Sequence, residues 1–452
     1  MPGNGPDTSV PGNGVDDAPD NVAGPPAADE VAGLLSDLIR INTSNPTHSE
    51  RPAAEWVAAK LDEVGIASEI IESDRGRASV VARVEGADPS RPPLLIHGHL
   101  DVVPAQAQEW TVDPFAGEIR DGLVWGRGAV DMKDMDAMTL AVIREWRRTG
   151  KKPPRDIVLA FLADEEAGGT YGAHHLVDHR PELFVDCTEA ISEVGGFSVS
   201  LNEQARLYLI QTAEKGIGWL RLKARNRPGH GSMVHPDNAV TQLARAVTRF
   251  GEYTSPVIVT DTMRELLDDI ATLTGLEFDE NDPDRSLRHF GAGARMLGAA
   301  LRNTANPTML EAGYKANVIP SSAEATIDTR FLPGQEAQWD ATVAELAGDD
   351  VEFEWLHKDI AVQTTFDGDL VDAMVSSLKA EDPGAHPVPY LMSGGTDAKS
   401  FATLGIRCFG FSPLLLPPDL DFTSLFHGID ERVPIDALQF GCRVLARFLD
   451  AC

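Results

Sequence analysis

A short apolar run that leads into imidazole and carboxylate side chains constrains this chain more than any other stretch. Residues 94–96 are Leu-Leu-Ile, as in a buried parallel strand, and His97, His99 and Asp101 follow before Pro104 ends the segment. Alternate residues of an extended chain share a face, so we expect the three polar side chains to point the same way. Ligands gather at the carboxyl ends of strands in open α/β sheets. The segment therefore predicts either the start of a metal site or a pair of histidines satisfied within a strand end.

Strands and helices alternate on both sides of this segment. Apolar runs predict strands over residues 68–72, 79–84, 94–97 and 156–163. Amphipathic patterns predict helices that start at Asp29 and near Arg51, and a third over residues 137–146. This alternation predicts an α/β fold with a doubly wound mixed sheet.

The pattern changes near Glu214, where a second domain is expected. Strands and helices in β-α-β-α-β order are predicted over residues 218–224, 237–250, 323–331, 335–346 and 351–355. We therefore expect a smaller, inserted α+β domain of ferredoxin-like type, with residues 253–306 as a helical elaboration inside it. The predicted divisions are a disordered Pro- and Gly-rich tail (1–28), the large domain in two parts (29–213 and 358–452) and the inserted domain (214–357).

Charge and cysteine usage exclude several kinds of partner. The chain of 452 residues has 39 basic and 70 acidic residues, a net charge of −31, which argues against nucleic acid and anionic membrane as partners. Its four cysteines are scattered without a C-x-x-C pair, so reduced thiols in the cytoplasm are expected rather than a disulfide framework. We also find neither an apolar run of membrane-spanning length nor a secretory signal.

Further carboxylates occur where a metal site would need them. Asp131 lies in the Gly-rich turn 126–133, where it either presents a carboxylate or caps the next helix. Glu165 and Glu166 follow the apolar run 156–163. Adjacent acids repel each other, so the pair favours a nearby cation, and because neighbours face opposite ways one could bind metal while the other reaches a bound water. The alternative is two solvated acids in a loop, which are common in so acidic a chain.

Two later segments add to this set. Glu193 ends another apolar segment, with Glu189 and Asp186 as competing candidates, and His427 lies in the segment 426–434 as either a ligand or a loop histidine. Together these side chains supply nitrogen and oxygen ligands without thiolates, as expected for a pair of zinc ions that act on a water.

The ordered motifs of this chain resemble those of one metallopeptidase family, which contains aminoacylase, carboxypeptidase G, carboxypeptidase S and succinyl-diaminopimelate desuccinylase. The motifs are Gly98-His99-Leu100-Asp101-Val102-Val103-Pro104, Gly126-Arg127-Gly128-Ala129-Val130-Asp131-Met132-Lys133, Glu165-Glu166, Glu193, Gly229-His230-Gly231-Ser232, Asn317-Val318-Ile319-Pro320, Gly394-Gly395-Thr396-Asp397 and the His427 segment. The resemblance runs from about residue 29 to the C-terminus. No single motif is specific to the family, but the recurrence of all of them in the family's order is.

The resemblance implies roles for the clustered residues. His99, Asp131 and Glu193 would hold one zinc ion, and Asp131, Glu166 and His427 a second, with Asp131 bridging. Asp101 would orient the His99 imidazole. Glu165 would be the general base for the attacking water. Cobalt or manganese could replace zinc, because this ligand set is permissive.

The resemblance also implies roles outside the metal centre. The inserted domain would be a lid and dimerisation domain, and His230 would donate to the oxyanion in the partner subunit of a homodimer. Asn317, Arg330, Gly395 and Thr396 are candidates for binding substrate. From the residues alone, His230 fits a turn histidine, whereas Arg330 fits a structural ion pair equally well and the Gly395 segment fits a tight turn equally well.

The activity implied is hydrolysis of an amide bond next to a free carboxylate, in an N-acyl amino acid, a dipeptide or the C-terminal residue of a peptide. Two alternatives stay open. The chain would either be a metal-binding homologue without turnover, or a desuccinylase or deacetylase of a biosynthetic intermediate. A serine hydrolase is disfavoured, because the chain has no G-x-S-x-G motif.

Overall fold

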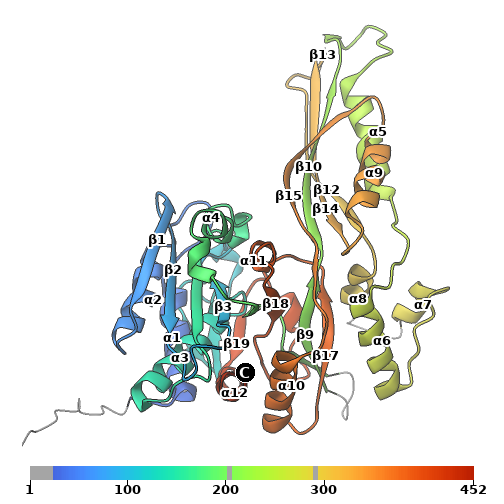
Figure 1. Ribbon diagram of the computed structural model, residues 1–452. Helices are drawn as coiled ribbons and strands as arrows, with labels where there is room; N and C mark the ends of the chain where they lie inside the picture. Colours follow the sequence, from blue (N-terminus) through green and yellow to red (C-terminus); the bar gives the residue numbers. More distant parts are fainter. Residues whose placement is uncertain (1–23, 201–205, 289–293) are drawn as a thin grey trace, which may run out of the picture.

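A computed structural model describes residues 24–200, 206–288 and 294–452 (Figure 1). Most of the predicted N-terminal tail, residues 1–23, lies outside the described residues. Helix α1 (Ala27–Arg40) begins two residues before Asp29, so the last two residues assigned to the tail are helical. Pro26 precedes its first turn, where the fixed φ of proline suits the start of a helix.

Among the described residues, ten strands form one mixed sheet. The path runs β1-β2-β6-β3-β7-β18-β9-β16, and β8 and β17 also pair with β9. The central strands β6, β3, β7 and β18 are mutually parallel. Strand β2 is antiparallel to both of its neighbours, β1 and β6. The strands are β1 (Ser68–Asp74), β2 (Arg77–Val84), β3 (Leu94–His99), β6 (Ile157–Leu162), β7 (Glu189–Ser192), β8 (Phe197–Ser200), β9 (Arg206–Glu214), β16 (Val362–Gln363), β17 (Ala385–Met392) and β18 (Arg407–Gly410). The predicted mixed α/β sheet is confirmed.

Helices cover both faces of this sheet because its central strands are apolar on both sides. Ile96 and Leu159 pack into a core with helices α1, α2 (Arg51–Asp62), α3 (Lys133–Thr149), α10 (Asp369–Glu381) and α12 (Ile435–Ala451). Their neighbours Leu95 and Val158 face a second core with α4 (Ala173–His179) and α11 (Ala398–Ala402). Successive residues of a strand point to opposite faces, so continuous apolar runs such as 94–96 require helices on both.

A second, four-stranded antiparallel sheet extends away from the first (Figure 1). Its order is β12-β14-β10-β15, and α5 and α9 pack on one face around Phe250, Trp339 and Leu220. The elements, in chain order, are β10 (Gly216–Arg225), α5 (Ala239–Glu252), β12 (Thr304–Ala312), β14 (Ser322–Phe331), α9 (Glu336–Ala347) and β15 (Glu352–Asp359). This β-α-β-β-α-β order is the ferredoxin-like arrangement. Strand β12 was not predicted, because its mostly exposed residues lack the alternating apolar pattern.

The helices between α5 and β12 were expected in the smaller domain, but they pack with the large domain. They are α6 (Asp261–Thr274), α7 (Pro283–Arg288) and α8 (Ala294–Ala300). Met263, Leu266 and Ile270 of α6 share a core with Val388 of β17 in the large sheet. The prediction that this segment elaborates the small domain is therefore wrong. The apolar face of α6 is buried against a strand that comes more than a hundred residues later in the chain, and local patterning could not show that.

Smaller elements complete the fold. A three-stranded sheet consists of β4 (Glu118–Arg120), β5 (Leu123–Trp125) and β19 (Arg432–Pro434). Strands β11 (Gly229–His230) and β13 (Val318–Ile319) pair at the far tip of the extended unit (Figure 1). Short 3₁₀ helices are η1 (Ala107–Glu109), η2 (Glu165–Ala167), η3 (Pro181–Phe184) and η5 (Phe422–Ser424). None of the helices that the structure describes is both long and apolar enough to cross a bilayer.

Candidate metal centre

Three adjacent parallel strands bring most of the candidate ligands to one edge of the large sheet. His99 is the last residue of β3, Glu165 and Glu166 begin η2 just after β6, and Glu193 follows β7. Strand β3 pairs in parallel with both β6 and β7, so their carboxyl ends lie side by side. Each apolar strand thus ends in a polar side chain at the same edge.

Asp131 and His427 reach this edge from loops. Asp131 lies in the turn before α3, where Gly126 and Gly128 have φ of 147° and 89°, values that favour glycine. Helix α3 has Met132 at its N-cap position without a side-chain hydrogen bond, so Asp131 does not cap the helix. Its carboxylate faces the two histidines instead, and His427 comes from the loop between η5 and β19.

His99, Asp131 and Glu193 form the first group of potential ligands. The Nε2 atom of His99 lies 3.2 Å from Oδ1 of Asp131 and 3.4 Å from Oε2 of Glu193. On the other side of the ring, Nδ1 is 2.9 Å from the main-chain carbonyl oxygen of Asp101. A proton on Nδ1 donates to that carbonyl and leaves the Nε2 lone pair directed at the two carboxylates. His99 is thus oriented so that its Nε2 could bind a metal ion.

Asp131, Glu166 and His427 form the second group. The Nε2 atom of His427 lies 3.1 Å from Oδ2 of Asp131 and 3.1 Å from Oε2 of Glu166. Within each group, the potential ligand atoms all lie within 4.8 Å of one another. Asp131 belongs to both groups, and its two oxygens face different histidines. A carboxylate in this position can bridge two cations.

The electrostatics of the cluster suit cations. Burial raises the pKa of Glu193 to about 7, and burial together with the charge of Asp131 raises the pKa of Glu166. Hydrogen bonds to Asp131 and Glu166 raise the pKa of His427 to about 10. Burial would raise the pKa of Asp131 as well, but its hydrogen bonds to His427 and His99 outweigh burial and lower it. The cluster therefore gathers negative charge that its own histidines only partly offset.

The residues present fit a pair of divalent metal ions. Each group offers one imidazole nitrogen and two carboxylates, a donor set that suits zinc in a catalytic site with an open position. In addition, Oε1 of Glu166 is buried and has no hydrogen-bond partner among the residues that the structure describes. Buried carboxylate oxygens are costly unless paired, so this atom is consistent with a ligand oxygen.

Glu165 belongs to neither group but lies beside them. Its Oε2 is 3.8 Å from Nε2 of His99, and burial followed by the charge of Glu193 raises its pKa well above the ordinary value. Glu165 also lines a small recess together with Gly395 and Thr396 from the loop between β17 and α11.

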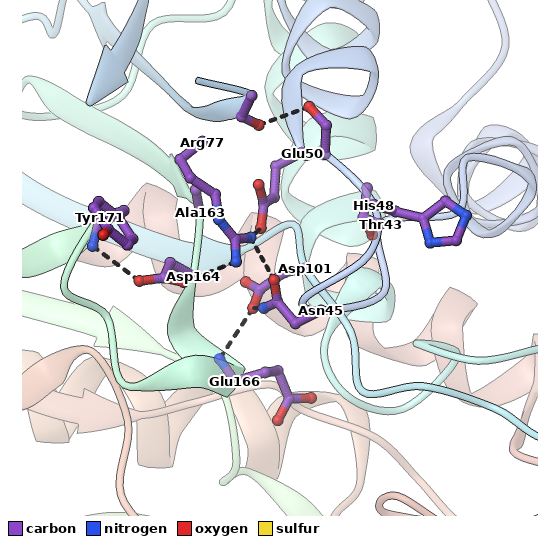
Figure 2. Close-up of polar contacts among 12 residues, drawn as sticks. Thr43, Asn45, His48, Glu50, Arg77, Asp101, Ala163, Asp164, Glu166 and Tyr171 are labelled. Atoms are coloured by element: carbon purple, nitrogen blue, oxygen red, sulfur yellow. Dashed lines mark hydrogen bonds and ion pairs between the residues drawn. The ribbon is translucent and has the colours of Figure 1, made fainter. Parts of the chain in front are cut away.

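Asp101 acts through its main-chain carbonyl oxygen and through its carboxylate, and Figure 2 shows the carboxylate beside Asn45 and Glu166. Its carbonyl oxygen contacts His99, whereas its carboxylate oxygen Oδ1 lies 3.6 Å from Nδ1, beyond hydrogen-bond range. The carboxylate accepts hydrogen bonds from the main-chain N–H groups of Glu165 (3.1 Å) and Glu166 (3.0 Å). Asp101 therefore holds both the imidazole and the segment that carries the two glutamates.

Two residues missed by the sequence reasoning connect the loops. Glu431 is fully buried and accepts hydrogen bonds from the main-chain N–H groups of Gly128, Val130 and Asp131. Arg127 pairs with Glu431 at 2.6 Å and donates to the carbonyl of His427 at 3.3 Å. The pair thereby fixes Asp131 relative to His427. Both residues lie inside segments already singled out, but nothing in the sequence distinguished them from surface charges.

Some candidates lie outside the cluster. His97 is buried against the Phe401 ring, and its Nδ1 lies 3.2 Å from the hydroxyl of Ser192, whereas its Nε2 has no hydrogen-bond partner among the described residues. Glu189, a competitor for Glu193, pairs with Arg155 instead.

The candidates from the smaller sheet are not brought to the metal centre within one chain. His230 belongs to β11 at the tip of the extended unit, is exposed, and contacts Ser232 through Nδ1 (2.8 Å). Asn317, also exposed, precedes β13 at the same tip. Arg330 forms a two-armed ion pair with Asp328, with contacts of 2.7 and 2.9 Å.

Known proteins resemble this chain in sequence and in fold. The family model described as peptidase family M20/M25/M40 matches residues 95–451. Aminoacylase-1 of Sus scrofa is 27% identical over 431 residues, covering 92% of this chain and 94% of the relative. A probable carboxypeptidase S-like 2 of Dictyostelium discoideum is 30% identical over 384 residues, covering 79% and 71%. Among solved structures, the M20 family metallo-carboxypeptidase Sso-CP2 of Sulfolobus solfataricus has the same fold, with a TM-score of 0.73 at 19% identity, covering 94% of this chain and 99% of that one.

Proposed function

The chain belongs to peptidase family M20/M25/M40, and from this premise we propose that it uses two zinc ions to hydrolyse an amide bond next to a free carboxylate. It is a metal-dependent hydrolase of the aminoacylase and carboxypeptidase type. The substrates proposed are N-acyl amino acids, dipeptides or the C-terminal residues of peptides. Aminoacylase and carboxypeptidase, the names of two relatives, both describe the release of an amino acid from an amide.

The observation that carries the proposal is the position of Asp131 between two ligand groups. Its Oδ1 faces His99 and its Oδ2 faces His427, and each histidine is accompanied by one further glutamate. A structural ion pair needs only one acid for each histidine. Two groups of three that share one carboxylate match the arrangement expected of a two-metal hydrolase.

Glu165 is proposed as the general base. Two zinc ions held by these groups would supply the Lewis acidity that makes a water nucleophilic near neutral pH. Glu165 would take the proton of the attacking water and later give it to the nitrogen of the leaving amine. No covalent bond to the protein is needed, because the water itself is the nucleophile. Asp101 would keep Glu165 in place through its main-chain hydrogen bond.

The remaining roles are proposed for the extended unit and the recess. The extended unit built from β10, α5, β12, β14, α9 and β15 would act as a lid and as a homodimer contact, and His230 would stabilise the oxyanion in the partner subunit's site. Gly395 and Thr396 line the recess beside Glu165 and would contact the substrate. Asn317 and Arg330 would bind the carboxylate or the carbonyl of the substrate, which for Arg330 requires the Asp328 pair to open. A cytoplasmic location is proposed on the basis of four free cysteines, three of them buried.

Metal removal tests the metal chemistry. Dialysis against a chelator should abolish hydrolysis across a panel of N-acetyl amino acids, dipeptides and N-succinyl diaminopimelate, and added zinc or cobalt should restore it. Hydrolysis that is insensitive to the chelator would refute the proposal.

Substitution of Glu165 tests the base assignment separately. Glu165→Gln should keep both metal ions and lose about 10²- to 10⁴-fold in kcat. Glu182→Gln, at an exposed glutamate on η3, is the matched control and should leave kcat unchanged. Wild-type turnover in Glu165→Gln would refute the assignment of the base.

A further inference from the structure

A buried cluster of charged and polar residues lies near Asp101 and Glu166 (Figure 2). Arg77, the first residue of β2, contacts Oε1 of Glu50 and Oδ1 of Asn45, and its Nη2 lies 3.2 Å from Oδ1 of Asp164. The Glu50 side chain is fully buried and that of Arg77 is 14% exposed. None of these residues was singled out by the sequence, and none lies in either ligand group.

One line of hydrogen bonds runs from this cluster to the catalytic segment through Asn45. The side-chain oxygen of Asn45 accepts from Arg77, so its NH₂ group must point the other way, where it donates to Oδ2 of Asp101. Asp101 in turn accepts from the main-chain N–H groups of Glu165 and Glu166. Arg77 therefore determines which end of the Asn45 amide meets Asp101.

A second line runs through Asp164, which directly precedes Glu165. One carboxylate oxygen of Asp164 contacts Arg77, and the other accepts from the N–H group of Tyr171 at 2.9 Å. Asp164 has φ of 71°, a conformation uncommon for residues other than glycine. The chain turns at Asp164 from β6 into η2, so the contact with Arg77 holds the turn that aims Glu165.

The three contacts use two nitrogens of the guanidinium, Nη1 for Glu50 and Asn45 and Nη2 for Asp164. Arginine presents five N–H donors in a fixed plane, whereas lysine has a single ammonium on a flexible stem. Arg77 is also the cation that contacts Glu50 and Asp164, and Oε2 of Glu50 has no hydrogen-bond partner among the described residues. A simpler role for Arg77, the neutralisation of the buried Glu50, therefore has to be separated by experiment from a role in positioning.

We propose that Arg77 is a positioning residue for the hydrolytic reaction, which sets the location of Glu165 and Glu166 through Asn45, Asp101 and Asp164. The inference rests on the proposed function of Glu165 as the general base. It assigns to Arg77 no contact with substrate or metal.

The test compares three variants of the zinc-loaded enzyme at saturating zinc. Arg77→Gln should lower kcat by about 10- to 100-fold, the usual cost of losing a partner behind an active-site group, with KM within threefold of wild type. Arg77→Lys should not rescue kcat, because the contacts use two nitrogens and the lysine side chain has one. The double variant Arg77→Gln/Glu50→Gln removes the unpaired charge of Glu50, and should regain thermal stability while kcat stays low. Recovery of wild-type kcat in the double variant would overturn the inference and leave Arg77 as a neutraliser of Glu50.

Two further variants keep the test decisive. If Arg77→Gln fails to fold, Asn45→Ala interrupts the first line while leaving the Arg77–Glu50 pair intact, and it should show the same fall in kcat. Wild-type kcat in Asn45→Ala would overturn the inference. Arg83→Gln is the matched control, because Arg83 lies on the same strand and forms a half-exposed pair with Asp156. Its kcat should match that of wild type, and a fall as large as that in Arg77→Gln would also overturn the inference.

Glu165→Gln, measured alongside, separates the two levels of the proposal. Loss of turnover in Glu165→Gln with full kcat in Arg77→Gln would overturn only the positioning role. Wild-type turnover in Glu165→Gln would overturn the proposed function and the positioning role with it.

Discussion

If Asp131 bridges two metal ions as proposed, substitution of Asp131 and substitution of His427 should remove different numbers of metal ions. His427 belongs to one ligand group, so His427→Ala should remove one metal ion and leave the site of His99, Asp131 and Glu193 filled. Asp131 belongs to both, so Asp131→Ala should weaken both sites. We therefore expect two zinc ions per chain in the wild type, one in His427→Ala and fewer than one in Asp131→Ala.

The same difference should appear in stability. A ligand that binds only the folded state stabilises it by about 2.7 kcal/mol at a free concentration of 100 times its Kd. Two such sites should give the wild type about 5 kcal/mol of zinc-dependent stability, His427→Ala about half of that, and Asp131→Ala close to none. The difference is taken between zinc-loaded and zinc-free protein of the same variant, so the intrinsic cost of each substitution cancels.

Atomic emission spectrometry of dialysed protein gives the stoichiometry, and urea denaturation with and without zinc gives the stability difference. His179→Ala, at an exposed histidine on α4, is the control and should retain two zinc ions. Two zinc ions in His427→Ala would exclude His427 as a ligand. One zinc ion bound with wild-type affinity in Asp131→Ala would show that Asp131 does not bridge, and would refute the argument from geometry.

Two other predictions concern buried charges. Glu431→Ala leaves the buried Arg127, which stays charged, without its partner, and should lower the free energy of unfolding by about 3 to 5 kcal/mol. Urea denaturation checks this against Asp367→Ala in an exposed pair, which should cost less than about 1 kcal/mol, and equal costs would contradict the prediction. Burial, and then the charge of Arg330, lowers the pKa of Lys215 to about 7 from its ordinary value of 10.5. The protonated amine therefore destabilises the folded state fully below about pH 7. This destabilisation decreases as the pH rises and is lost by pH 10.5. Lys215→Met should therefore raise Tm more at pH 6 than at pH 9.5, and a gain independent of pH would contradict this prediction.

The sequence by itself was sufficient to predict at which edge of the sheet the candidate metal centre lies. Apolar runs that end in His99, Glu165-Glu166 and Glu193 predicted buried strands with polar ends. Parallel strands place such ends at one edge, so chemistry-bearing residues more than ninety positions apart were expected together. The mixed α/β sheet followed from the same runs, because continuous apolar strands need helices on both faces.

Tertiary structure alone decided how those residues are held. They are held by contacts between residues far apart in the chain. Arg77 contacts Asn45, 32 residues away, and Arg127 contacts Glu431, 304 residues away. In a chain with 70 acidic residues, a buried glutamate such as Glu431 looks like any surface acid until packing excludes water from it.

The same limit explains the two places where the fold differs from the one predicted. Helix α6 packs on β17, which comes more than a hundred residues later, and β12 forms because β14 offers it an edge to pair with. Local patterns show which face of a helix is apolar and where a buried strand ends. They do not show which distant surface will cover that face or satisfy that charge, because this depends on contacts that exist only once the chain has folded.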